Sequence, residues 1–388
     1  MAVNNMSIEQ AYTLINAIHD QVVGYEEIAA VDTATFTSVA QKTLAAGYEP
    51  VLNAITQVLS KTLIAVRPYN RKFKGLEVST ERWGGIIRKI SFADKPAEQD
   101  PTYALTDGQA VDQFVVKKPG VVETRYVGSN AYEGSYTIFT KQLDTAFSSP
   151  SEFAAFMSGL MTHFSNEREQ WLEDNSRAIL LNMIAAKSTA NGGVDTIHLL
   201  TEYNQATGLS LTAITVKQPA NFPAFSKWLY ARVQNISQLM TERTMFGQVD
   251  LGRIYRHTPV EDQRIYMNAD FLAHMSAEVI ADTYHDNFLR FADVEPVNFW
   301  QSMYDPLTVN AKPVYINEAG AVVTGNDTEV DNVLGVMFDR DAMGYNIYDD
   351  SLETSPYNAK GQYYNLFSHV RVQNQNDLTE KVIVLCLD

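Results

Sequence analysis

The chain has 388 residues, of which 45% are hydrophobic, and it carries a formal net charge of −16 at pH 7. This length allows two or more hydrophobic cores, because single domains usually contain about 100 to 200 residues, and the hydrophobic content excludes a disordered chain. The acidic balance speaks against a general nucleic-acid-binding protein, which would carry a basic surface.

The cysteine content and the distribution of apolar residues limit the environment of the protein. Cys386 is the only cysteine in the sequence, which excludes an internal disulfide and a cysteine-based metal cluster and suits a reducing compartment. The longest apolar runs are too short for a membrane-spanning helix. Residues 1–20 lack a basic segment followed by an unbroken apolar run, so we expect no signal peptide.

The first part of the chain has helical patterns. Ser7 and Gln10 form a capping box before an amphipathic helix that ends at Gly24. Two further helices are expected over 35–46 and 49–63. Together these segments predict an N-terminal helical arm.

Strand patterns follow the helices. Alternating apolar and polar residues cover 86–92, and similar runs return at 121–127 and 135–140. The interval 93–119 is polar and too long for an ordinary hairpin loop. We therefore predict a projecting two-stranded arm with a large tip.

A long helix is the clearest element of the sequence. Ser149 is its N-cap, Pro150 its first helical residue, and Glu152 completes the capping box. The helical pattern continues to about Lys187, which gives a rod of roughly 57 Å at 1.5 Å per residue. One face carries its large apolar side chains, namely Phe153, Phe156, Met157, Leu160, Met161, Phe164 and Trp171. Strand-like segments on both sides of this helix speak against an all-α protein.

The remaining half of the chain reads as a compact mixed region of helices and strands. A helix is expected over 222–240, and a strand, turn and helix over 264–291. Strands are expected over 210–216, 294–299, 313–316, 333–338, 345–348, 362–372 and 382–387. The fold class is therefore α+β.

The search for chemistry finds no catalytic, cofactor-binding or metal-binding motif. His163 and Glu167 are spaced as an ion pair on the long helix, and a surface pair is the better interpretation than catalysis. Asp339 opens a segment with the length of a calcium-binding loop, but Met343 stands where an oxygen ligand is needed and no helices flank it. We interpret this segment as a turn between strands, and the protein as no enzyme.

A basic cluster stands out in this acidic chain. It consists of Arg67, Arg71, Lys72 and Lys74, with Tyr69 and Phe73 between the charges. Three interpretations are open: a solvated face, contact with DNA, and ion pairing with an acidic neighbouring chain, which we prefer. The aromatic residues would then be apolar anchors at a protein interface.

Further candidates for contacts between subunits lie close to the predicted arm. Trp83 precedes two glycines, a corner that could bring a neighbouring backbone close, although a plain turn fits equally well. Three lysines belong to the polar interval, namely Lys95, Lys117 and Lys118. With the basic cluster, these residues form the predicted set of inter-subunit contacts.

This order of elements resembles that of tailed-phage major capsid proteins with the Hong Kong 97 fold, most of all those of the short-tailed podophages. The resemblance spans nearly the whole chain. Its most specific pieces are "YTLINAI", "VRPYNRKFKG", "RIYMNADFLAHM" and "YDDSLETSPYNAKGQYYNLFSHV".

The resemblance implies five structural parts. These are an N-terminal arm over 1–65, an extended β-loop over 66–148, a spine helix and peripheral domain over 149–200, an axial domain over 201–330, and return strands of the peripheral domain over 331–388. The chain starts close to the arm, so we expect a separate scaffolding protein or none.

The resemblance also implies a function. The protein would assemble in the host cytoplasm as hexamers and pentamers into the icosahedral shell of a virion, with a portal protein as partner and double-stranded DNA against the inner face. No membrane and no cofactor take part. Two alternatives remain open: an encapsulin-like nanocompartment shell that encloses protein cargo, and an α/β enzyme of unidentified activity.

Overall fold

The structure is a computed structural model that describes residues 6–24, 29–62, 69–78, 86–95, 97–103, 105–127, 130–282, 294–317 and 319–388. The chain divides into two compact units. Unit 1 comprises Met1–Gly85, Ser129–Asn175 and Asn346–Gln373, and unit 2 comprises Ile86–Gly128, Ser176–Tyr345 and Asn374–Asp388.

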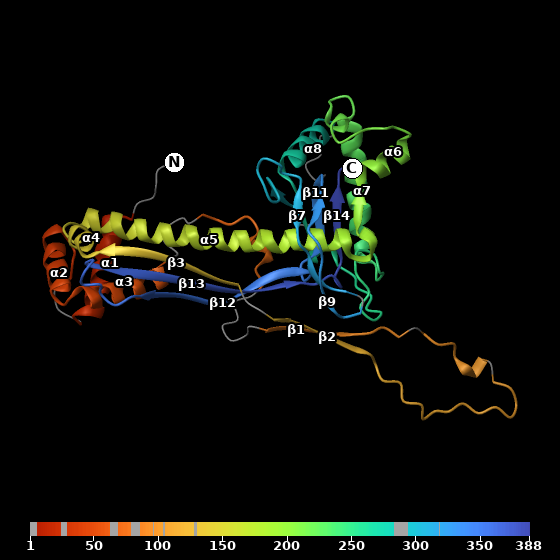
Figure 1. Cartoon of the computed structure of the whole chain (residues 1–388), viewed down its shortest axis with the longest axis horizontal. Helices are drawn as coiled ribbons and strands as arrows, with labels where there is room; N and C mark the ends of the chain where they lie inside the picture. Colours follow the sequence, from red (N-terminus) through yellow and green to blue (C-terminus); the bar gives the residue numbers. More distant parts are fainter. Residues whose placement is uncertain are drawn as a thin grey trace. The chain divides into compact units, whose positions relative to one another are not determined.

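Unit 1 combines helices with a three-stranded sheet. Its helices are α1 (Ile8–Val22), α2 (Thr33–Ala45), α3 (Tyr48–Thr62), α4 (Thr140–Ala146) and the first part of α5 (Pro150–Thr189), with the 3-10 turn η1 (Lys74–Leu76). Its sheet has the order β12 (Met343–Thr354), β13 (Tyr363–Asn376) and β3 (Asn130–Phe139). β13 and β3 pair antiparallel, and Figure 1 shows both strands running alongside α5.

The hydrophobic core of unit 1 joins elements that are far apart in the sequence. Ile15 of α1, Phe36 of α2 and Ile55 of α3 are completely buried. They belong to one cluster with Phe153 of α5 and Leu366 of β13. The rings of Phe36 and Phe153 lie 5.9 Å apart between centroids. The apolar faces of the helices expected at the N-terminus are therefore used within the subunit.

Unit 2 is built on a five-stranded sheet of order β4 (Thr196–His198), β14 (Val382–Cys386), β11 (Val333–Asp339), β5 (Gln263–Asn268) and β6 (Val294–Val297). Its helices are the last part of α5, α6 (Leu199–Thr207), α7 (Phe222–Thr241) and α8 (Ala269–Asp282). The 3-10 turns are η2 (Pro101–Tyr103), η3 (Ala190–Gly193), η4 (Thr215–Lys217) and η5 (Val260–Asp262). β11 pairs on both sides, with β14 and with β5, and every residue of this central strand is buried.

Three small sheets complete unit 2. β7 (Val309–Ala311) pairs with β10 (Thr328–Val330), and β8 (Val314–Ile316) pairs with β9 (Val322–Thr324). β1 (Ile86–Phe92) and β2 (Val121–Val127) form an antiparallel ribbon.

Most sequence predictions of single elements are confirmed. The capping box of α1 is present, since Gln10 N–H donates to Ser7 Oγ and Ser7 N–H to Gln10 Oε1. The long helix runs over 40 residues from Pro150 to Thr189, slightly further than expected. The α+β class is also confirmed. The division into five capsid parts stays a prediction.

The prediction of a strand over 210–216 is wrong. This segment is a coil that continues into η4, because its polar side chains bind the local backbone. Asn204 binds both N–H and C=O of Leu211 through its side chain, and Thr212 Oγ1 accepts from the N–H of Thr215. Such local bonds compete with the pairing of strands. Ile214 is 79% exposed and Val216 is completely buried, although a strand would place both side chains on the same face.

Candidate assembly surfaces

The ribbon β1–β2 has two chemically different faces. Side chains alternate between the faces of a strand, and here Lys89 and Ser91 point toward the rest of unit 2 while Arg88, Ile90 and Phe92 point outward. The outward face exposes large apolar side chains. Ile90 is 53% exposed and Phe92 64% exposed. A monomeric protein rarely leaves such a face uncovered.

Two arginines add charge to the outward face. Arg88 and Arg125 are directly opposite each other in the register of the ribbon. Glu123 Oε1 lies between them and accepts a hydrogen bond of 2.7 Å from the Nε of each. These bonds, first from Arg125 and then from Arg88, lower the pKa of Glu123, so the carboxylate stays charged. One carboxylate thus holds two guanidinium groups side by side on the exposed surface.

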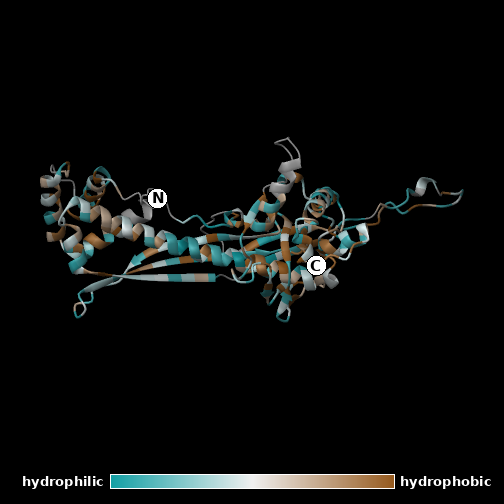
Figure 2. Cartoon of the chain, turned by 90° about the horizontal axis from the view of Figure 1, so that it is seen from above, coloured by the Kyte–Doolittle hydropathy of each residue, from teal (hydrophilic) through white to brown (hydrophobic). Residues whose placement is uncertain are grey.

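The loop between the strands carries exposed apolar side chains of its own. Tyr103 is 89% exposed, Phe114 82% and Val116 79%. The loop is organised by short-range bonds, in which the carboxylates of Asp100 and Asp112 accept from backbone N–H groups two residues further on. In Figure 1 this loop extends away from the other elements of unit 2, and Figure 2 shows hydrophobic stretches along it. A loop of this kind has no core to bury them.

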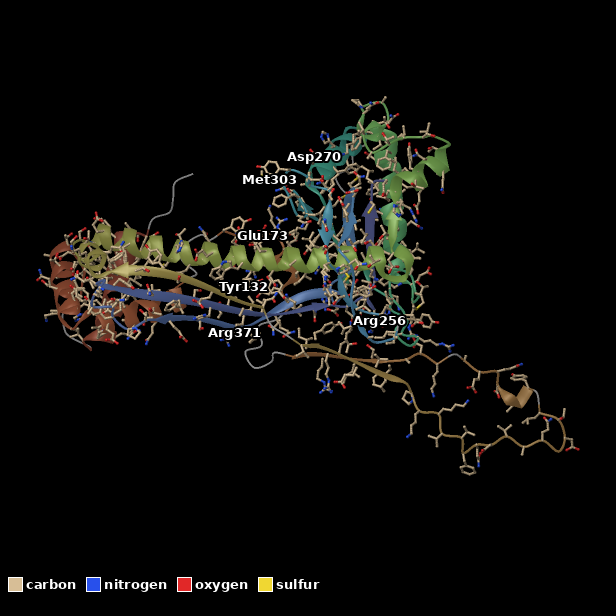
Figure 3. The ribbon with its side chains drawn as sticks, in the orientation of Figure 1. Tyr132, Glu173, Arg256, Asp270, Met303 and Arg371 are labelled. Carbon is tan, nitrogen blue, oxygen red and sulfur yellow. The ribbon has the colours of Figure 1, made fainter. Side chains whose placement is uncertain are left out.

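In unit 1 the basic segment after α3 turns its arginine inward. Arg71 is 7% exposed and forms ion pairs with Glu77 and with Glu169 of α5. Tyr69 donates its hydroxyl to Glu173 Oε2 at 2.8 Å, and Figure 3 labels Glu173 on α5. These bonds attach the segment to α5 of the same subunit.

The other predicted contact residues divide into two groups. Lys72, Lys74, Lys95, Lys117 and Lys118 are exposed, and Lys117 pairs with Glu98 across the loop. Arg67 and Trp83 lie outside the described residues. Phe73, expected as an interface anchor, is 1% exposed and so belongs to the interior of unit 1. Sequence reasoning missed the exposed apolar residues of the ribbon, although the alternation over 86–92 already placed Ile90 and Phe92 on one face.

Two kinds of site were considered for the described residues, a metal site and a membrane-spanning helix. Among them, no group of three or more histidine, cysteine or acidic side chains could hold a metal ion, and no helix is long and apolar enough to cross a membrane. His163 Nε2 lies 3.3 Å from Glu167 Oε1 on the surface of α5, as predicted. Asp339 ends β11 and accepts hydrogen bonds from Thr258 and from the N–H of Asp341, so the segment is a turn between strands.

Solved structures share the fold. The capsid structure of Staphylococcus phage Andhra aligns with a TM-score of 0.53 and 12% identity, over 84% of this chain and 86% of that chain. A structure described as the head fiber and inner core protein gp22 of native bacteriophage P68 aligns with a TM-score of 0.55 and 11% identity, over 84% and 87% of the two chains. No curated protein sequence matches this chain.

This α+β fold, with its long helix and its uncovered ribbon, is the Hong Kong 97 fold of tailed-phage major capsid proteins. A family model described as Phi29-like phage major capsid protein matches residues 15–386, and the chain belongs to this family. It is a structural component of the virion. The nanocompartment and enzyme alternatives are thereby set aside.

Proposed function

We propose that each subunit lays its ribbon β1–β2 and the loop 93–120 on an adjacent subunit, and that hexamers and pentamers held in this way close the shell. The shell would enclose double-stranded DNA without sequence specificity, with a portal protein at one position and a separate scaffolding protein or none during assembly. The observation that carries the proposal is the exposure of Tyr103, Phe114 and Val116 at the far end of the ribbon.

The magnitudes favour an assembly contact of moderate strength. Full burial of Phe114, Val115 and Val116 would contribute roughly 1.5–3 kcal/mol for each side chain. Association of two proteins costs about 4–15 kcal/mol in lost freedom of motion. This cost is comparable to the combined contribution of the three side chains. One loop therefore cannot hold two subunits together by itself. In a closed shell every subunit makes such a contact and also accepts one, so many contacts together can hold the subunits in place.

The charge of the protein also favours a second copy of this chain as the partner. The chain carries a net charge of −16, so a second copy presents a predominantly acidic surface. Lys72, Lys74, Lys95 and Lys118 are exposed and would pair with it. Arg71 is used inside the subunit and drops out of this set.

The test replaces residues 97–118 with a short Gly-Ser linker. Asp94 is kept, because it accepts hydrogen bonds from Arg243 and from the N–H of Tyr255 within unit 2. The subunit should remain soluble and folded, with unchanged circular dichroism, since both hydrophobic cores lie elsewhere. Electron microscopy should find few or no closed shells.

A matched pair of point variants sharpens the test. Phe114→Ser changes an apolar residue that is 82% exposed on the loop, and Ile214→Ser changes one that is 79% exposed outside it. Only the first should lower the yield of shells. Normal shells from the linker variant would refute the proposal, and so would an unfolded subunit, because the loop would then belong to a core.

A further inference from the structure

The root of the ribbon, where β1 meets the rest of unit 2, contains a compact group of charged side chains. Lys89 of β1 binds Asp377 at 2.6 Å and also pairs with Glu380. The two carboxylates are almost completely buried, with side chains 5% and 8% exposed, and Lys89 is 25% exposed. Arg256 Nε lies 3.2 Å from Oε1 of Glu380, the same oxygen that Lys89 binds. Two positive and two negative charges thus meet in a poorly solvated place.

Two members of this group, Asp377 and Arg256, are oriented by further bonds. Asp377 Oδ1 accepts from the N–H and the hydroxyl of Thr379, which leaves Oδ2 for Lys89. Arg256 donates to Ser91 Oγ at 2.6 Å, so it links the ribbon to the acidic turn from a second direction. Figure 3 labels Arg256 close to β2.

The turn that carries the two acids, residues 377–381 between β13 and β14, is itself firmly held. Lys187 of α5 is completely buried and donates to the carbonyl of Leu378 and to Asp195. Lys381 is also completely buried and donates to the carbonyl of Glu242, just after the end of α7. The turn 377–381 is therefore a fixed platform for the two acids, because hydrogen bonds join it to α5 and to the end of α7.

The ribbon depends on such a platform for its direction. A two-stranded ribbon is marginally stable alone, and in the described part of the chain β1 and β2 form a sheet only with each other. Apolar contacts would let the ribbon tilt at small energetic cost, because they have no preferred direction. The ion pairs favour one arrangement, since moving the ribbon would leave the two buried acids without their lysine partner.

We propose that Lys89, Asp377, Glu380 and Arg256 are positioning residues that fix the direction in which the ribbon leaves unit 2. The inference rests on the proposed role of the ribbon in assembly. It names the residues that orient the ribbon toward the neighbouring subunit. None of these four side chains has to touch the neighbour.

The test measures ribbon direction in the unassembled subunit, independently of shell formation. Spin labels are placed at Lys118→Cys in the loop and Val194→Cys, which is 72% exposed on unit 2. The native Cys386 is 1% exposed and should escape labelling. The distance distribution between the labels is then compared in four backgrounds: no further change, Lys89→Gln, Lys89→Arg and Arg88→Gln.

Lys89→Gln should broaden the distance distribution at least twofold and lower shell yield about tenfold. Lys89→Arg keeps the charge and should restore the narrow distribution. Arg88→Gln is the matched control, since it removes an ion pair from the same strand on the outward face, where the side chain is 56% exposed. It should leave the distribution unchanged.

A second variant covers the case that Lys89→Gln unfolds the subunit. Lys89→Met combined with Asp377→Asn removes one charge of each sign, and Glu380 keeps Arg256 as its partner, so no uncompensated buried charge remains. It should fold and still broaden the distribution. An unchanged distribution in the folded variants would overturn the inference. A broadened distribution with normal shells supports the positioning role and contradicts the proposed function of the ribbon, which separates the two failures.

Discussion

Gly134 of β3 is a position where a single added methyl group should have a measurable effect on unit 1. A Cβ built at Gly134 would lie 2.4 Å from Cη2 and 2.8 Å from Cζ2 of Trp171, and 3.1 Å from Glu167 Oε2. The indole ring is stacked on Tyr132, with centroids 6.5 Å apart and planes inclined by 14°, and Figure 3 labels Tyr132. The ring therefore has to leave this arrangement if Gly134 becomes alanine.

The expected cost follows from two opposing effects. Overpacking of this kind destabilises by about 1–3 kcal/mol. Replacing a strand glycine by alanine returns roughly 0.5–1 kcal/mol, because the unfolded chain loses conformational freedom. Gly134→Ala should therefore lower the unfolding free energy of unit 1 by about 1 kcal/mol, within a range of about 0–2.5 kcal/mol. The change is measured by urea unfolding of the unassembled subunit followed by tryptophan fluorescence.

Two further variants make the reasoning refutable. Gly159→Ala lies within α5, where an added Cβ meets no atom within 4 Å, so it should stabilise by about 0.5–1 kcal/mol. Trp171→Leu removes the clash, so Gly134→Ala should cost little when introduced into that background. Wild-type stability of the single Gly134→Ala variant, or an equal cost with and without the indole ring, would show that the close approach does not constrain β3.

The remaining predictions concern two buried groups of unit 2. Burial lowers the pKa of Lys381 to about 8 from 10.5, so the unfolded state binds more protons between these values and stability should rise with pH across this range. Urea unfolding at pH 7.5 and pH 10 should show this rise, and Lys381→Met should lack it; an equal rise in the variant would assign it to another group. Burial also raises the pKa of the Cys386 thiol to about 12, so iodoacetamide should modify it only after unfolding, and rapid reaction of the native subunit would contradict the burial.

Local sequence rules were sufficient wherever the structure is decided within a few neighbouring residues. The capping box of Ser7 and Gln10, the Pro150 start of α5 and the period-two pattern of β1 each determine their element by short-range bonds or by alternation. The same rules failed at 210–216, because the side-chain bonds of Asn204 and Thr212 to the backbone outweigh the strand pattern.

The assembly surfaces could be identified only from the tertiary structure, because the burial of a side chain depends on residues that are distant in the sequence. Arg71 is drawn inward by Glu169, 98 residues further on, so a basic cluster in the sequence became partly an internal ion pair. Lys89 meets Asp377, 288 residues away, and the pattern of β1 alone gives no sign of that partner. The sequence by itself determined that a long helix and a projecting ribbon exist. Only the packing of distant segments decided which charges are shared within the subunit and which apolar side chains remain exposed for another.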